Sequence, residues 1–129
     1  MPNETLPNIQ PTLRVIPMVY DTNPRGDIFG GWLMSQIDIA GATVAALRAK
    51  GPVATINVNE LTFRAPLFVG DIVSFYAKVI TVGTKSLTVE VDVFAERDRQ
   101  LSDEVVRVSH AVLVYVAISE PGQSRVIPQ

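Results

Sequence analysis

The hydrophobic positions that follow Gly31 recur at the spacing of an α-helix. The apolar residues of one face, at steps of four and three, are Leu33, Ile37, Ala40, Val44 and Leu47. The opposite side is also apolar or small, with Ile39, Ala42, Ala45 and Ala46. A helix that is apolar on most sides is typically buried. We expect it to begin at Gly31 and to end near Gly51-Pro52, which cannot continue a helix.

The rest of the chain shows the alternating pattern of β-strands. Segments rich in β-branched residues span 53–63, 71–82, 85–96 and 104–119, and a shorter one spans 12–18. Residues 70–71, 83–84 and 97–102 carry the glycine and polar residues of turns. Because connections of this length join neighbouring strands, the sheet is predicted to be antiparallel.

One long buried helix and about five strands predict an α+β domain. A flat sheet would leave half of the helix in water, so we expect the sheet to curl around it. This domain is expected to occupy residues 12–129. Residues 1–11, with their prolines, are expected to form a flexible arm. Long strands with open edges also favour pairing with a second copy of the chain.

The composition excludes several classes of function. A net charge of −2 with scattered basic residues gives no surface for a nucleic-acid backbone. The absence of cysteine and the presence of one histidine argue against a metal site and fit a cytoplasmic location. Neither a signal peptide nor an apolar run of about 18 residues is visible, so stable membrane insertion is not expected.

The most informative chemistry surrounds the start of the helix. Asp38 is a carboxylate among apolar residues, where lost hydration makes it a candidate base. Gly31 lies seven residues earlier, two helical turns away on the same side. The N–H groups of Gly30 and Gly31 lack intrahelical acceptors and suit a developing oxyanion. Asn23 precedes them in a turn and offers a positioning amide. Together these are the parts of an acyl-hydrolysis site.

Each of these residues also has an ordinary structural interpretation. An aspartate on a helix commonly faces solvent, and a glycine pair commonly forms a turn. Asn23-Pro24 is common turn chemistry. The joint spacing of these residues therefore carries more weight than any one of them.

That spacing resembles the hot-dog acyl-CoA thioesterases, and within them the YciA-like branch. The principal motif is N-P-R-G-D-I-F-G-G-W-L-M-S-Q-I-D at residues 23–38. Further similar stretches are L-T-F-R-A-P-L-F-V-G-D (61–71), G-T-K-S (83–86), V-L-V-Y-V-A (112–117) and R-V-I-P (125–128). The resemblance covers residues 12–128 and implies a hot-dog fold in which a curled antiparallel sheet wraps one central helix.

The resemblance also implies roles for the motif residues. Asp38 matches the family's general base or nucleophile, and Asn23 matches its positioning asparagine. Gly30 and Gly31 match the backbone that receives the thioester carbonyl. Many relatives carry histidine where this chain has Phe29, which leaves oxyanion stabilisation to the backbone. The family needs no cofactor, because coenzyme A is part of the substrate, and its sites lie at the interface of a dimer or of a trimer of dimers.

Other residues are weaker candidates for binding the coenzyme. Trp32 is a candidate for lining the substrate channel, although an aromatic residue at a helix start commonly packs in the core or at an interface. Arg64 is a candidate for phosphate binding, but the YciA-like pattern places its arginine one position later. The glycine turn of residues 83–86 supplies Gly83, Thr84, Lys85 and Ser86, whose alternative role is a solvated hairpin. His110, inside a strand without an evident partner, is expected to be structural or exposed.

Two other functions are compatible with such a fold. A non-catalytic acyl-CoA-binding regulator would need an attached DNA-binding segment, and the arm at residues 1–11 is too short for one. A hydratase-like lyase would need a histidine near the helix aspartate, and this helix has none. The sequence therefore favours hydrolysis of acyl-CoA thioesters.

Overall fold

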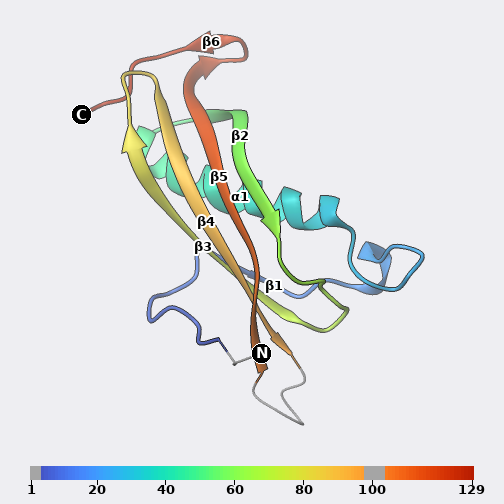
Figure 1. Ribbon diagram of the computed structural model, residues 1–129. Coiled ribbons are helices and arrows are strands. Elements are labelled where there is room, and N and C mark those ends of the chain that lie inside the picture. Colours follow the sequence, from blue (N-terminus) through green and yellow to red (C-terminus); the bar gives the residue numbers. More distant parts are fainter. Residues whose placement is uncertain (1–3, 98–103) are drawn as a thin grey trace.

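The computed structural model of the chain describes residues 4–97 and 104–129, and it has one α-helix and one sheet (Figure 1). The elements are β1 (Leu13–Val15), a 3₁₀ turn (Val19–Asp21), α1 (Gly30–Ala49), β2 (Val53–Phe63), β3 (Ile72–Val82), β4 (Ser86–Arg97), β5 (Glu104–Glu120) and β6 (Gln123–Ser124). The predicted helix and four long strands are confirmed to within two residues. Beyond Arg97, the turn predicted at 97–102 lies outside the described residues.

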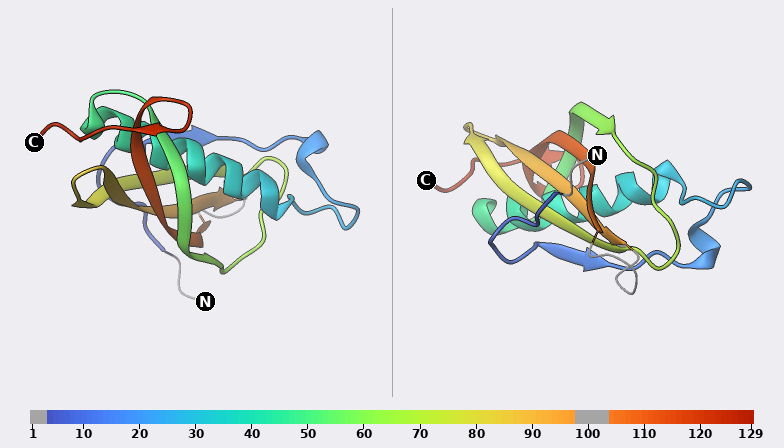
Figure 2. Two further views of the ribbon diagram at one scale, coloured as in Figure 1. Left: turned by 90° about the horizontal axis from the view of Figure 1, so that it is seen from above. Right: turned by 60° about the horizontal axis from the view of Figure 1, so that its bottom comes forward.

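The sheet is antiparallel, as predicted, with strand order β1-β3-β4-β5-β2. A sixth short strand, β6, pairs with the end of β5 and was not predicted. Figure 2 shows the twisted sheet curving past α1, which packs along one of its faces. The described strands do not close around the helix, so one side of α1 is left without a covering strand.

This open side corrects one expectation about the helix. The residues that are buried are Leu33, Ile37, Ala40, Gly41, Ala45 and Ala49. Leu47, predicted on the core face, is 75% exposed, and Ile39 is 52% exposed. The prediction of a helix buried on most sides is therefore wrong for a single chain. The sheet covers only a stripe of α1 formed by these buried residues, which continues through Ala45 and Ala49.

The core lies between this stripe and the inner face of the sheet. Five alternate residues of β4 face the helix and are almost fully buried, namely Leu87, Val89, Val91, Val93 and Ala95. This confirms the predicted alternation, since Glu90 and Asp92 lie on the other face. No helix within the described residues is long and apolar enough to cross a membrane.

Strand β2 forms one edge of the sheet and is mostly exposed. It pairs only with β5 among the described strands, and Ile56, Val58 and Phe63 leave apolar surface open. Its register against β5 is interrupted twice, between Thr55 and Asn57 and between Val58 and Glu60. These are β-bulges, each of which adds one residue to the edge strand.

Candidate active site

Asp38 of α1 lies over the inner face of the sheet and is held there by two hydroxyl groups. The Thr55 hydroxyl donates to Asp38 Oδ1 at 2.7 Å, and the Tyr115 hydroxyl donates to the same oxygen at 2.9 Å. Thr55 and Tyr115 face each other across the β2–β5 pair. Adjacent strands therefore present both donors to one carboxylate oxygen. Asp38 Oδ2 has no protein partner within the described residues.

The sequence pattern did not single out Thr55 or Tyr115. They lie 17 and 77 residues from Asp38 along the chain, and only strand pairing brings them together. Tyr115 was visible as an inward position of an alternating strand, which predicts core packing and not a polar contact. A polar hydroxyl among inward apolar positions was the one available signal, because buried hydroxyls require partners.

Asp38 borders a mostly apolar cleft between α1 and the sheet. The cleft has a volume of about 250 Å³. Its lining residues are Met34, Ser35, Ile37, Asp38, Thr55, Val58, Leu61, Ala111 and Leu113. Six of these nine are aliphatic or methionine side chains, so the cleft suits an apolar group placed beside a carboxylate.

A second cleft, of about 300 Å³, lies at the start of the helix and is lined in part by Asn23, Gly30, Phe63 and Arg64. The loop before the helix forms one wall. It is anchored by the Ile28 N–H, which donates to the Leu67 carbonyl at 2.9 Å. Asn23 Oδ1 accepts the Arg25 N–H at 2.8 Å. This bond uses only the amide oxygen of Asn23, so its side-chain NH₂ keeps its capacity to donate.

The helix begins at Gly30, one residue earlier than predicted, and Phe29 is its N-cap. The N–H groups of Gly30 and Gly31 have no intrahelical acceptor and lie at the positive end of the helix dipole. Gly30 lines the second cleft. Phe29 is 51% exposed and brings no hydrogen-bond donor in its side chain. Backbone N–H groups are therefore the donors that this helix start offers.

The structure brings only part of the predicted site together within one chain. Asn23, Gly30 and Arg64 share the cleft at the helix start, whereas Asp38 lines the apolar cleft. Trp32 is half-buried against the core and lines neither cleft. Within one chain, Asp38 and Asn23 therefore line different clefts.

Residues 83–86 form the turn between β3 and β4, away from both clefts. Figure 1 shows this turn near the C-terminal end of α1, while the 21–29 loop lies at the other end. The turn is tied to β5 and to the C-terminal tail. The Ala117 N–H donates to the Lys85 carbonyl at 2.9 Å, and the Ile127 N–H donates to the Thr84 carbonyl at 2.8 Å.

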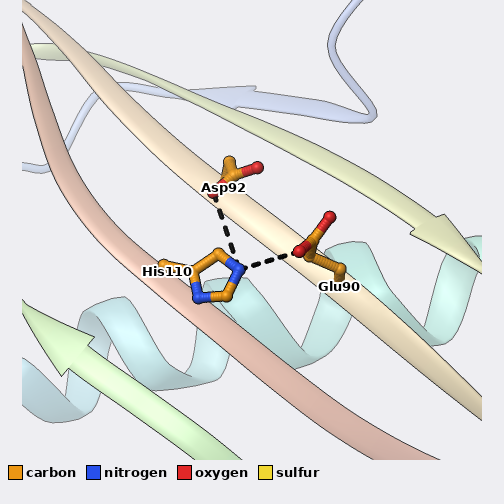
Figure 3. A group of neighbouring side chains, drawn as sticks. All are labelled: Glu90, Asp92 and His110. Carbon is orange, nitrogen blue, oxygen red and sulfur yellow. Dashed lines mark hydrogen bonds and ion pairs between the residues drawn. The ribbon is translucent and has the colours of Figure 1, made fainter. Parts of the chain in front are cut away.

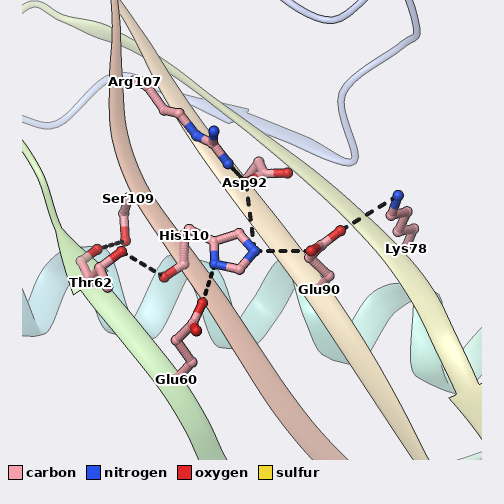
Figure 4. Close-up of polar contacts among 8 residues, drawn as sticks. All are labelled: Glu60, Thr62, Lys78, Glu90, Asp92, Arg107, Ser109 and His110. Carbon is pink, nitrogen blue, oxygen red and sulfur yellow. Dashed lines mark hydrogen bonds and ion pairs between the residues drawn. The ribbon is translucent and has the colours of Figure 1, made fainter.

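His110 has partners that the sequence did not reveal (Figures 3 and 4). Its Nδ1 contacts Glu60 of β2, and its Nε2 lies 3.0 Å from Glu90 of β4. Asp92 lies 3.9 Å from Nε2. Lys78 pairs with Glu90, and Arg107 pairs with Asp92. This cluster lies on the sheet face opposite α1, so His110 is remote from Asp38.

The His110 cluster should make stability depend on pH. Hydrogen bonding to Glu90, and then to Glu60, raises the pKa of His110, and the same contact lowers the pKa of Glu90. The histidine contribution is complete below about pH 6.5 and is lost as the pH rises through the raised folded-state pKa. The glutamate contribution is present above its unfolded-state pKa and is lost as the pH falls. The cluster therefore stabilises most in mildly acidic solution.

Between pH 6 and pH 9 the free energy of unfolding of the wild type should fall by about 1 kcal/mol more than that of His110→Gln, a size limited by solvent screening. Urea denaturation of both proteins at the two pH values measures this difference. Equal changes in the two proteins would show that the cluster does not contribute.

Comparison with known proteins agrees with the fold and with the motif. Residues 25–102 match the thioesterase superfamily. The acyl-CoA thioester hydrolase YciA of Escherichia coli is 40% identical over 120 residues, covering 90% of this chain and 89% of that protein.

Solved structures give the same result. A hexameric thioesterase from Yersinia pestis superposes with a TM-score of 0.87 at 44% identity, covering 96% of this chain and 99% of that chain. A hexameric hot-dog fold thioesterase of Campylobacter jejuni gives a TM-score of 0.87 at 42% identity, with coverage of 92% and 90%. The sequence match, the motif and the arrangement of one helix against an antiparallel sheet lead to one conclusion: this chain belongs to the thioesterase superfamily and has the hot-dog fold.

Proposed function

We propose that this protein hydrolyses acyl-CoA thioesters to a carboxylic acid and free coenzyme A. The observation that carries this proposal is the environment of Asp38. One of its oxygens is held by Thr55 and Tyr115, the other has no protein partner in the described structure, and an apolar cleft lies beside it. An oriented carboxylate next to an apolar cleft suits an acyl group whose carbonyl carbon is to be attacked.

Asp38 acts on this carbonyl in one of two ways. As a base, it removes a proton from water as the water attacks the carbonyl carbon. As a nucleophile, it forms a mixed anhydride that water then hydrolyses. In both cases the thiolate of coenzyme A leaves. The N–H groups of Gly30 and Gly31 stabilise the oxyanion, and the amide of Asn23 orients the reactants. Neither route requires a cofactor.

Two copies of the chain complete each site in this proposal. Asn23 and Gly30 line one cleft and Asp38 lines another, so one protomer supplies the oxyanion-binding end and its partner supplies the carboxylate. The open edge of β2 and its exposed apolar residues support such pairing. The assembly is a dimer or a trimer of dimers, in keeping with the hexamers described for the two solved relatives.

The coenzyme is expected to follow the cationic positions near the clefts. Arg64 lines the same cleft as Asn23 and is exposed, which suits a phosphate group. Gly83, Thr84, Lys85 and Ser86 remain candidates for a second contact with the coenzyme, supplied by another protomer. Trp32 remains a candidate for packing along the channel. The lack of cysteine supports a cytoplasmic location for this chemistry.

The acyl chain is expected to occupy the apolar cleft, where Ala111 sets the depth. Ala111 is fully buried and lies between Leu61 of β2 and Val91 of β4 in the inner row of the sheet. Ala111→Val fills part of the cleft, so kcat/KM for long acyl chains should fall about tenfold or more, and that for acetyl-CoA should fall least. Ala117→Val is the matched control, because Ala117 is also fully buried on β5 but does not line this cleft. Equal losses for all chain lengths would contradict the assignment.

The proposed activity is tested by thiol release from acyl-CoAs of increasing chain length. Purified wild-type protein is expected to release coenzyme A from several of them, as followed with a thiol reagent. Folded oligomer that binds acyl-CoA and releases no thiol from any member of the panel would reject hydrolysis and favour a binding module.

A further inference from the structure

Tyr115 is an unusual residue for the inner face of this sheet, because it places a hydroxyl inside an otherwise apolar core. Its side chain is fully buried. The hydroxyl lies 2.9 Å from Asp38 Oδ1 and 3.1 Å from the Asp38 backbone carbonyl oxygen. Both contacts of the tyrosine hydroxyl with α1 are thus made to the same residue.

A glycine on the helix leaves room for this hydroxyl. Gly41 follows Asp38 by one helical turn and is buried against the tyrosine. A methyl group placed on Gly41 would overlap the Tyr115 hydroxyl oxygen and would approach its ring carbon Cζ to 3.1 Å. Glycine inside a helix is less stabilising than alanine. The space that Gly41 leaves is the space that the tyrosine needs in order to reach Asp38.

We propose that Tyr115 is a positioning residue for thioester hydrolysis and that Gly41 is the residue that allows it to act. This inference rests on the proposed function of Asp38. Tyr115 and Thr55 together fix Oδ1 toward the sheet. The planar carboxylate then presents Oδ2 to the cleft, where water and the thioester carbonyl are expected.

The tyrosine is suited to this task because it remains a donor. Burial, and then the neighbouring Asp38 carboxylate, raises the pKa of the Tyr115 hydroxyl well above its usual range. The hydroxyl therefore stays protonated throughout the range in which the enzyme would work. A donor that is always protonated can hold Asp38 Oδ1 in one orientation over the whole working range.

Tyr115→Phe tests the role of the hydroxyl while preserving the ring. We expect kcat to fall about tenfold with KM changed by less than about twofold, because one hydrogen bond to a charged group is lost. A purely structural role for the hydroxyl would lower the stability of the folded protein and leave the kcat of the folded enzyme unchanged.

Tyr76→Phe is the matched control. Tyr76 is also buried on this sheet, at 7% exposure, and its ring packs edge-to-face on Phe94, remote from Asp38. Its kcat and KM should equal those of the wild type. If Tyr115→Phe also keeps the wild-type kcat, the proposal is overturned.

Gly41→Ala completes a double-mutant cycle. In the wild type the new methyl group displaces the hydroxyl from Asp38, so kcat should fall at least as far as in Tyr115→Phe. In the Tyr115→Phe background the overlapping oxygen is gone, and the same change should lower kcat by less than about twofold. Equal losses of kcat in the two backgrounds would overturn the link between Gly41 and Tyr115.

These experiments distinguish the proposed hydrolysis activity from the proposed role of Tyr115. Circular dichroism and urea denaturation establish that each variant is folded, and if Gly41→Ala does not fold, Tyr115→Phe still decides the role of the hydroxyl. Wild-type protein without thiol release would refute the proposed function itself. Active wild type with an unaffected Tyr115→Phe variant would refute only the positioning role.

Discussion

Replacing Asp38 with asparagine is expected to lower kcat for acyl-CoA hydrolysis by about 10³-fold. The change removes the negative charge, and with it the group that takes a proton from water or attacks the carbonyl. Asparagine keeps the shape of the side chain. Its Oδ1 can still accept the hydroxyl protons of Thr55 and Tyr115, which donate to this position in the wild type.

Asp38→Asn therefore tests the catalytic role of the carboxylate without disturbing the folded structure. Its unfolding transition should lie close to that of the wild type, while thiol release is lost. Glu60→Gln is a suitable control for the removal of one carboxylate, because Glu60 belongs to the His110 cluster on the opposite sheet face. That control should retain wild-type kcat. A fully active Asp38→Asn variant would show that another group performs the reaction.

Mixing two inactive variants is expected to restore activity. If each site takes Asn23 from one protomer and Asp38 from the other, a mixed dimer of Asn23→Ala and Asp38→Ala chains contains one intact site and one doubly altered site. Random reassociation makes half of the dimers mixed, so the mixture should reach about one quarter of wild-type activity.

The experiment requires exchange of subunits, by co-expression with two different tags and isolation of the doubly tagged protein. For a dimeric assembly, the doubly tagged protein should then show about half of wild-type activity, since one of its two sites is intact. Each variant alone serves as the control. Doubly tagged protein no more active than the better single variant would show that one chain supplies the whole site.

The elements of this fold were largely predictable because each has a strong local pattern. The alternation from Leu87 to Ala95 determined both the strand and its buried face, and all five residues face the core. The burial of the helix was less predictable. The apolar residues Ile39 and Leu47 suggested a helix covered on most sides, but burial depends on what packs against it, and the sheet of one chain covers only one side.

The site was predictable only where it is local in sequence. Asp38, Gly30 and Asn23 lie within sixteen residues of one another, so their spacing and family resemblance could be seen directly. The hydroxyls of Thr55 and Tyr115 reach Asp38 through the pairing of β2 with β5, which no local pattern encodes. The partners of His110 escaped prediction for the same reason, because Glu60 and Glu90 come from two other strands.

The two bulges of β2 have a consequence for how this strand can change in length. From Thr55 to Leu61 the strand advances six residues, while its partner advances only from Tyr115 to Ala111. Because side chains alternate between faces, one bulge alone would turn either Thr55 or Leu61 away from the helix. With two bulges, Thr55 and Leu61 both face the helix side of the sheet. A single-residue insertion or deletion between Thr55 and Leu61 is expected to keep the sheet hydrogen-bonded but to turn the Thr55 hydroxyl away from Asp38. Changes of two residues should therefore be tolerated better than changes of one.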